Sequence, residues 1–173
     1  MSERALLVVD MLNDFMDPDG SLFCGPASRA IIPVIAGLLE RHRREGSAII
    51  FVKDSHLPDD KEFELFPPHC LSGEPGSEII PELAPLAGET VLPKSRYSAF
   101  FNTGLDKMLR DKGVAEVHLC GVCTSICVMD TCSDLRNRDY TTIVHVAAVA
   151  DFDSQAHEFS LKRMRNILGA RLV

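Results

Sequence analysis

Three side chains suited to covalent and acid–base chemistry each follow an apolar run that is typical of a buried strand. They are the carboxylate of Asp10 after residues 5–9, the amine of Lys94 after residues 90–92, and the thiol of Cys127 in the turn beyond residues 116–120. Taken singly, each has an ordinary interpretation, since Asp caps turns, Lys is usually solvated and Cys packs well in a buried helix. If the three runs are strands of one parallel sheet, their carboxyl ends meet at one edge and the three groups come together.

Together these groups can transfer an acyl group from an amide. The thiolate is the nucleophile, and we expect a helix N-terminus and the Lys94 ammonium to lower the pKa of Cys127. Asp10 can accept the thiol proton and return it to the leaving amine. Backbone N–H groups of residues 123–127 can hold the developing oxyanion, at about 3 kcal/mol per donor. The predicted intermediate is a thioester.

A second group of polar residues follows the apolar run at residues 48–52. Asp54 and His56 are two positions apart, so their side chains share one side of an extended segment, and Glu62 and His69 come next along the chain. Two imidazoles with one or two carboxylates suit Zn²⁺, Mn²⁺ or Fe²⁺. A polar surface loop with two incidental histidines fits the same residues, and at this point both interpretations stay open.

The other four histidines have no such neighbours along the sequence. His118 and His145 fall within predicted strands, where we expect them to be packed or hydrogen-bonded. His42 falls on the predicted exposed face of a helix, and His157 lies in a later helix. None of the four is predicted to bind a ligand.

Strands and helices alternate along the chain. Apolar runs that do not alternate with polar residues predict strands covered on both faces, and such strands joined by helices favour a mostly parallel sheet. The predicted fold is α/β, a three-layer α/β/α sandwich with about six strands. We expect strands at residues 5–9, 48–52, 90–92, 116–120, 142–146 and 170–173, and helices at residues 29–45, 78–83, 105–112, 125–136 and 154–168.

Length and composition narrow the class of protein. The 173 residues suit a single domain, residues 1–173, and the longest apolar runs are far shorter than the roughly 20 residues that cross a bilayer. The start MSERALLVVD does not have the pattern of a signal peptide, so we expect a cytoplasmic protein with reduced thiols and no membrane partner. A net charge of −7 without a basic stripe argues against a nucleic-acid partner.

Four stretches, in this order, resemble a known family. They are VVDMLNDF, DSHLPDDKEFELFPPHCLSGEPGSE, PKSRYSAF and GVCTSICV. The chain resembles the isochorismatase-like cysteine hydrolases, and within them the nicotinamidase/pyrazinamidase branch. The resemblance implies hydrolysis of nicotinamide and pyrazinamide to the acid and ammonia, a place in NAD salvage, and a homo-oligomer.

The resemblance also implies roles for particular residues. Asp10, Lys94 and Cys127 match the catalytic triad of the family. A cis peptide between Val122 and Cys123 is implied, and it would orient the N–H groups of Cys123 and Cys127 as an oxyanion hole. The family's metal ligands match Asp54, His56 and His69, with Glu62 as the fourth ligand and Glu64 as a less favoured substitute.

One divalent metal ion, zinc before manganese or iron, would bind the pyridine nitrogen of the substrate in such a site. Four aromatic residues would wall the substrate pocket, and ordinary core packing is the alternative for each of them: Phe15, Phe66, Tyr97 and Phe100. The chain departs from many relatives in having Ser125 where they have Asp, and in its short length. Both departures bear on the substrate.

Three rival interpretations remain. A redox protein could hold a metal or cluster on four cysteines, but a strand and a helix would scatter these ligands: Cys120, Cys123, Cys127 and Cys132. A non-catalytic binding module would not need an intact Asp, Lys and Cys. Within the enzyme class, the substrate could be another small amide, such as a carbamoyl or ureido compound. Cys24 and Cys70 are assigned to loops without a role.

Overall fold

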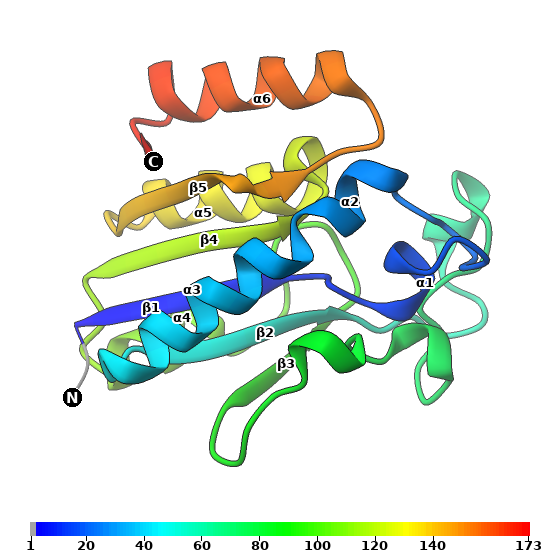
Figure 1. Cartoon of the computed structure of the whole chain (residues 1–173), viewed down its shortest axis with the longest axis horizontal. Coiled ribbons are helices and arrows are strands. Elements are labelled where there is room, and N and C mark those ends of the chain that lie inside the picture. The colour runs from blue at the N-terminus through cyan, green and yellow to red at the C-terminus, as the bar shows by residue number, and fades with distance from the viewer. Residues whose placement is uncertain (1–2) are drawn as a thin grey trace.

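The computed structural model describes residues 3–173, so the first two residues of the expected domain lie outside the description. Six strands form one sheet in the order β3-β2-β1-β4-β5-β6, and every neighbouring pair is parallel (Figure 1). The predicted α/β fold with a parallel sheet is confirmed. The strands are β1 Arg4–Val9, β2 Ala48–Asp54, β3 Thr90–Lys94, β4 Glu116–Val122, β5 Thr141–Ala150 and β6 Arg171–Leu172.

Helices cover both faces of the sheet and complete the three layers. Helices α2 and α3 pack on one face, whereas α4, α5 and α6 pack on the other (Figure 1). Short α1 lies beyond the carboxyl end of β1. The helices are α1 Asn13–Met16, α2 Pro26–Ala30, α3 Ile32–Arg44, α4 Leu105–Asp111, α5 Met129–Asn137 and α6 Ser154–Asn166.

Strand β1 shows why the apolar runs are continuous. Ala5, Leu7 and Val9 point into the core beneath α4, α5 and α6, and Leu6 and Val8 point into the core beneath α2 and α3. All five side chains are buried, because successive residues of a strand face opposite sides and both sides carry helices.

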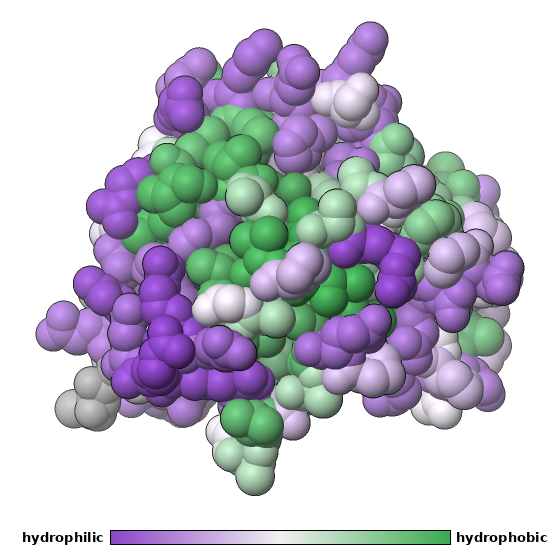
Figure 2. All heavy atoms as spheres, viewed as in Figure 1, coloured by the Kyte–Doolittle hydropathy of each residue, from purple (hydrophilic) through white to green (hydrophobic). Residues whose placement is uncertain are grey.

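The solvent side of the helices is polar. In the view of Figure 1, hydrophilic side chains cover α6 and the C-terminal end of α3, and apolar side chains gather in a patch below α6 (Figure 2). Within residues 3–173, no helix is both long enough and apolar enough to cross a membrane.

Several helix boundaries differ from the prediction. The helix expected at residues 29–45 is two helices, because the chain breaks at Ile31 and α3 begins anew with Pro33 in its first turn. Residues 78–83 form no α-helix; only Pro81–Leu83 makes a 3₁₀ turn. The helix expected at residues 125–136 begins instead as a π-helical turn, Thr124–Val128, and continues as α5. The prediction missed α1.

The prediction that His42 lies on an exposed helix face is wrong. Its side chain is fully buried, because Ile35, Leu39 and His42 follow each other at helical spacing on the face of α3 that packs on the sheet. The expectation that His118 and His145 are packed or hydrogen-bonded is confirmed, since their ring nitrogens lie 2.8 Å apart.

Strands β1 and β4 approach each other very closely near the end of β4. Gly121 pairs with Val9 and has a φ of +114°, in the region that favours glycine. A Cβ atom on Gly121 would lie 2.0 Å from the carbonyl oxygen of Val9. The next peptide bond, Val122–Cys123, is cis. The sequence thus places a glycine where the backbone turns out of the sheet toward Cys123.

We expect Gly121→Ala to lower the free energy of unfolding by at least about 2 kcal/mol, because a backbone oxygen that is held in the sheet cannot move away from the added methyl group. Gly37→Ala is the matched control. Gly37 lies in α3 with open space around its Cα, so this change should raise stability by about 0.5–1 kcal/mol. Urea denaturation of both variants checks the pair, and a neutral Gly121→Ala would contradict the close approach.

Candidate active site

A cavity of about 290 Å³ opens at the carboxyl ends of the strands, where a parallel α/β sheet forms its binding sites. Its wall is mainly apolar, and a few titratable groups converge on it. Asp10, Cys127 and Asp54 line it together with Glu62 and His69. The volume is at the low end of the range for ligand pockets and suits a small molecule.

Three of the predicted residues are in contact, and two of them, Asp10 and Cys127, line this cavity. Lys94 Nζ lies 2.9 Å from Asp10 Oδ2 and 3.4 Å from Cys127 Sγ. Lys94 also donates a hydrogen bond to Asp54, its partner in the register of β2 and β3. The backbone N–H of Asp54 donates to Asp10 Oδ1 at 3.0 Å. The ends of β1, β2 and β3 thus bring together Asp10 and Asp54, which lie 44 positions apart in the chain, and Asp54 and Lys94, which lie 40 apart.

All three side chains are buried, and burial governs their protonation. It raises the pKa of Asp10 to about 7, with the charge of Asp54 adding to the effect and Lys94 opposing it. Burial alone would lower the pKa of Lys94, but the carboxylates of Asp10 and Asp54 outweigh it and hold that pKa well above its usual value. Lys94 is therefore charged at neutral pH.

The expectation of a lowered pKa for Cys127 is wrong for the resting site. Burial raises the pKa of this thiol well above its usual value, and the charges of Asp10 and Asp54 add to that effect, so the opposing charge of Lys94 is outweighed. Cys127 also lies in the π-helical turn rather than at the start of a regular helix. A base must therefore remove the proton before this sulfur can act as a nucleophile.

The backbone around Cys123 and Cys127 forms one wall of the cavity. Both residues line it, and the cis peptide Val122–Cys123 joins them to β4. The carboxylate of Asp151, at the end of β5, accepts a hydrogen bond of 2.8 Å from the backbone N–H of Ser125. This bond holds the turn between β4 and α5, and it was not predicted.

The second predicted group also assembles. Ligand atoms of Asp54, His56 and His69 lie within 4.8 Å of one another, and all three residues are buried. Glu62 Oε1 lies 3.8 Å from His69 Nε2, whereas the alternative, Glu64, is exposed. His56 Nε2 and Glu62 Oε2 are buried and have no hydrogen-bond partner within residues 3–173. Buried polar atoms without a partner, next to a cluster of possible ligands, fit a divalent metal ion.

Asp60, a residue that was not predicted to belong to the site, positions His56. Its carboxylate lies 3.0 Å from His56 Nδ1 and also binds the guanidinium of Arg96 at 2.9 Å. Burial would raise the pKa of Asp60, but bonds from the Glu62 amide, His56 and Arg96 lower it to about 2. An ionised carboxylate on one ring nitrogen leaves the other free for a metal. The spacing of four residues from His56 was the only signal in the sequence.

Three of the four aromatic residues predicted for the substrate pocket lie in the wall of the cavity. Phe15, Phe66 and Tyr97 line the cavity. Phe100 does not; its ring packs in the core under α4 and α5, 4.6 Å from the guanidinium carbon of Arg138. The cavity has further apolar lining that was not predicted: Leu22, Phe23, Cys24, Val122, Ile126 and Phe152.

The cysteines do not form a metal cluster. Cys120 and Cys123 pack in the core beneath α2 and α3, and Cys127 and Cys132 pack in the core on the other side. In the part of the chain that the structure describes, no potential metal group contains more than one cysteine. Cys24, expected to be a loop residue without a role, lies in the cavity wall with its sulfur 3.4 Å from that of Cys123.

Comparison with known proteins agrees with this geometry. The Isochorismatase domain matches residues 4–172, nearly the whole chain. The chain belongs to the isochorismatase family. The sequence resemblance to this family is therefore confirmed.

Solved structures of the isochorismatase family superpose closely on the chain. A nicotinamidase from Bacillus subtilis is 36% identical, with a TM-score of 0.94 over 99% of each chain. A pyrazinamidase from Pyrococcus horikoshii in complex with zinc is 30% identical, with a TM-score of 0.93 over 99% of this chain and 98% of that one. An N-carbamoylsarcosine amidase from Thermoplasma acidophilum is 37% identical, with a TM-score of 0.89 over 99% and 95%.

We expect Asp60→Asn to weaken zinc binding about 10- to 100-fold, because the amide loses the charge that orients and polarises His56. Asp59→Asn is the matched control, since Asp59 is the exposed neighbour in the chain. Competition with a chromophoric chelator measures both affinities. Equal affinities in the two variants would remove Asp60 from the support of this site.

Proposed function

We propose that this chain hydrolyses nicotinamide and pyrazinamide to the corresponding acid and ammonia. The observation that carries the proposal is the contact of Asp10, Lys94 and Cys127 at the base of a small cavity with aromatic walls. Two structures of the family, a nicotinamidase and a pyrazinamidase, superpose on the chain with TM-scores above 0.9. The substrate class is a small aromatic carboxamide.

Acylation begins with a proton transfer. Asp10, with a pKa of about 7, accepts the proton of the Cys127 thiol, and the thiolate attacks the amide carbon. The N–H groups of Cys123 and Cys127 hold the oxyanion. When the C–N bond breaks, Asp10 returns the proton to the nitrogen, ammonia leaves, and the acyl group stays on Cys127 as a thioester.

Deacylation uses the same residues in reverse. Asp10 takes a proton from a water molecule, the hydroxide attacks the thioester, and the C–S bond breaks to give the acid. The departing sulfur regains its proton from Asp10. Lys94 stays charged throughout and stabilises whichever neighbour is negative, first Asp10 and then the thiolate.

The residues that would hold a divalent metal are Asp54, His56, Glu62 and His69. A bound ion there supplies a Lewis acid for the ring nitrogen of the substrate. Asp54, Glu62 and His69 line the cavity, and Asp54 also joins this group to Lys94. Zinc suits two imidazoles and carboxylates, and the relative from Pyrococcus horikoshii was solved with zinc.

A second candidate within the same reaction class is hydrolysis of a carbamoyl compound. The 37% identity to an N-carbamoylsarcosine amidase favours it. The aromatic side chains of Phe15, Phe66 and Tyr97 favour a flat aromatic substrate instead, because stacked rings stabilise each other. We further propose that the protein works in the cytoplasm in NAD salvage, as an oligomer of like chains.

Ammonia release from nicotinamide tests the proposal. We expect turnover by the purified protein, loss of turnover with a chelator, recovery with zinc, and at least about a 10⁴-fold loss in Cys127→Ala. Cys132→Ala is the matched control, because Cys132 is equally buried but packs in the core away from the cavity.

The outcomes separate the two substrates. Release from N-carbamoyl amino acids but not from nicotinamide would replace the proposed substrate and keep the thiol mechanism. Full activity of Cys127→Ala on either compound would overturn the mechanism itself.

A further inference from the structure

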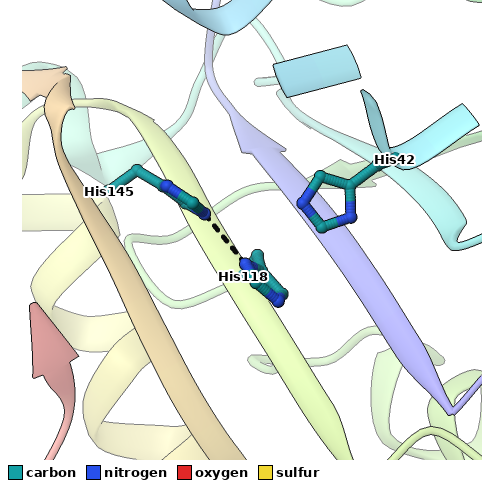
Figure 3. A group of neighbouring side chains, drawn as sticks. All are labelled: His42, His118 and His145. Carbon is teal, nitrogen blue, oxygen red and sulfur yellow. Dashed lines mark hydrogen bonds between the residues drawn. The ribbon is translucent and has the colours of Figure 1, made fainter. Parts of the chain in front are cut away.

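Three buried histidines meet on the face of the sheet that α3 covers. His42 comes from the last turn of α3, His118 from β4 and His145 from β5 (Figure 3). Within residues 3–173 they form one of three side-chain groups that could hold a metal ion, with ligand atoms within 4.8 Å of one another. Three histidines gathered from three elements are rigidly placed, since each element is anchored in the core.

The sheet brings two of them together. His118 pairs in register with Ile143, so His145 lies two positions further along the neighbouring strand and on the same face. His118 Nδ1 and His145 Nε2 are 2.8 Å apart, and His42 lies across from them on the helix, with its ring centroid 4.5 Å from that of His118.

Outer partners orient two of the rings. Glu116 Oε1 lies 3.0 Å from His118 Nε2, which fixes the proton there and leaves Nδ1, the nitrogen that faces His145, as the metal-binding atom. Ser47 Oγ lies 2.9 Å from His42 Nδ1, so Nε2 is the nitrogen left for a metal, and it faces the guanidinium of Arg41 at 3.5 Å. A carboxylate or hydroxyl behind a ligating imidazole is the usual arrangement in metal sites.

The rings are also uncharged at neutral pH. Burial is the main cause that lowers the pKa of His42 and of His145 to about 4, and it lowers the pKa of His118 as well. Neutral imidazoles present a lone pair, the form in which histidine binds metals. The small exposed fractions of His118 (7%) and His145 (8%) show that solvent reaches the group.

We propose that His42, His118 and His145 form a second metal site, which binds a divalent transition-metal ion such as zinc through one nitrogen of each ring. Three imidazoles without a carboxylate suit zinc, copper or nickel rather than magnesium or calcium. The site joins α3 to β4 and β5, so a bound ion stabilises the folded chain.

This site is separate from the catalytic cavity. His118 lies four residues before Val122 on β4, which is about 13 Å at the usual rise of a strand. None of the three histidines lines the cavity. The proposal therefore stands whether or not the proposed amide hydrolysis is right.

Metal binding requires small local shifts of the side chains. Zn–N bonds of about 2.0–2.1 Å in a tetrahedron place two nitrogens about 3.3 Å apart, so the rings of His118 and His145 must separate by about 0.5 Å. His145 must also carry its proton on Nδ1 to free Nε2. The guanidinium of Arg41 must move away from His42 Nε2, 3.5 Å from it, and its charge is partly offset by Glu45, 3.9 Å away. Glu116 lies behind His118.

Zinc stoichiometry tests the proposal. We expect protein stripped with a chelator to take up about two zinc ions per chain in equilibrium dialysis, and His145→Gln and His118→Gln to take up about one. His157→Gln is the matched control, because this histidine belongs to neither group and should leave the count at two. His69→Ala should lose only the ion of the catalytic cavity, and His69→Ala with His145→Gln should bind none.

These variants distinguish zinc bound by the three histidines from zinc bound in the catalytic cavity. If His69→Ala alone abolishes zinc binding, or if His145→Gln and His118→Gln bind as much zinc as the wild type, the second site is overturned. If only the proposed site in the cavity binds no zinc, the wild type takes up one ion per chain and His145→Gln takes up none.

Because a variant can fail to fold, the wild type is tested directly as well. Crystals soaked in zinc should show an anomalous-scattering peak between the three rings. No peak there at full occupancy of the other site would equally refute the proposal.

Discussion

The site depends on the ion pairs that the buried ammonium of Lys94 forms with its neighbours. From the end of β3 this ammonium contacts the carboxylates of Asp10 and Asp54, at the ends of two other strands, and the thiol of Cys127, in the turn after a fourth. Removing one partner of such a buried pair leaves an uncompensated charge and costs about 3–5 kcal/mol. Burial and the negative charge of Asp54 together outweigh Lys94, so the carboxyl of Asp10 holds its proton more tightly than usual. The group that pairs with Lys94 is therefore also the one proposed as the base.

The parallel sheet explains why these groups meet. In parallel strands all carboxyl ends lie at one edge, and the register of β2 with β3 sets Asp54 directly beside Lys94. Asp54 then faces two ways, toward Lys94 and toward His56, whose Nε2 lies 3.6 Å from its other oxygen. A single carboxylate thus couples the residues proposed for the chemistry to those proposed for the metal.

The sequence predicts the parts of this structure that depend on local pattern. Continuous apolar runs locate the strands, and the polar residues that follow them locate the cavity, because strand ends and site coincide in this fold. What it could not show depends on side-chain direction in three dimensions. Phe100 turns into the core, Asp60 reaches back to His56, and His42 joins two histidines more than 70 positions away in the chain. Two strands and a helix separate His42 from β4 along the chain, so a search for neighbours in the sequence does not find that contact.

The protonated thiol sets the order of events at the site. In the resting state the negative charge lies on the carboxylates, and the sulfur is neutral. Moving the proton from Cys127 to Asp10 shifts that charge by a few ångströms, while Lys94 contacts both ends of the path at 2.9 and 3.4 Å. The total charge of the buried group does not change, so the transfer avoids the cost of creating a new charge in a low-dielectric interior. In the proposed mechanism the nucleophile forms only by this internal transfer and is shielded between turnovers, and Asp10 holds the proton where the leaving nitrogen needs it.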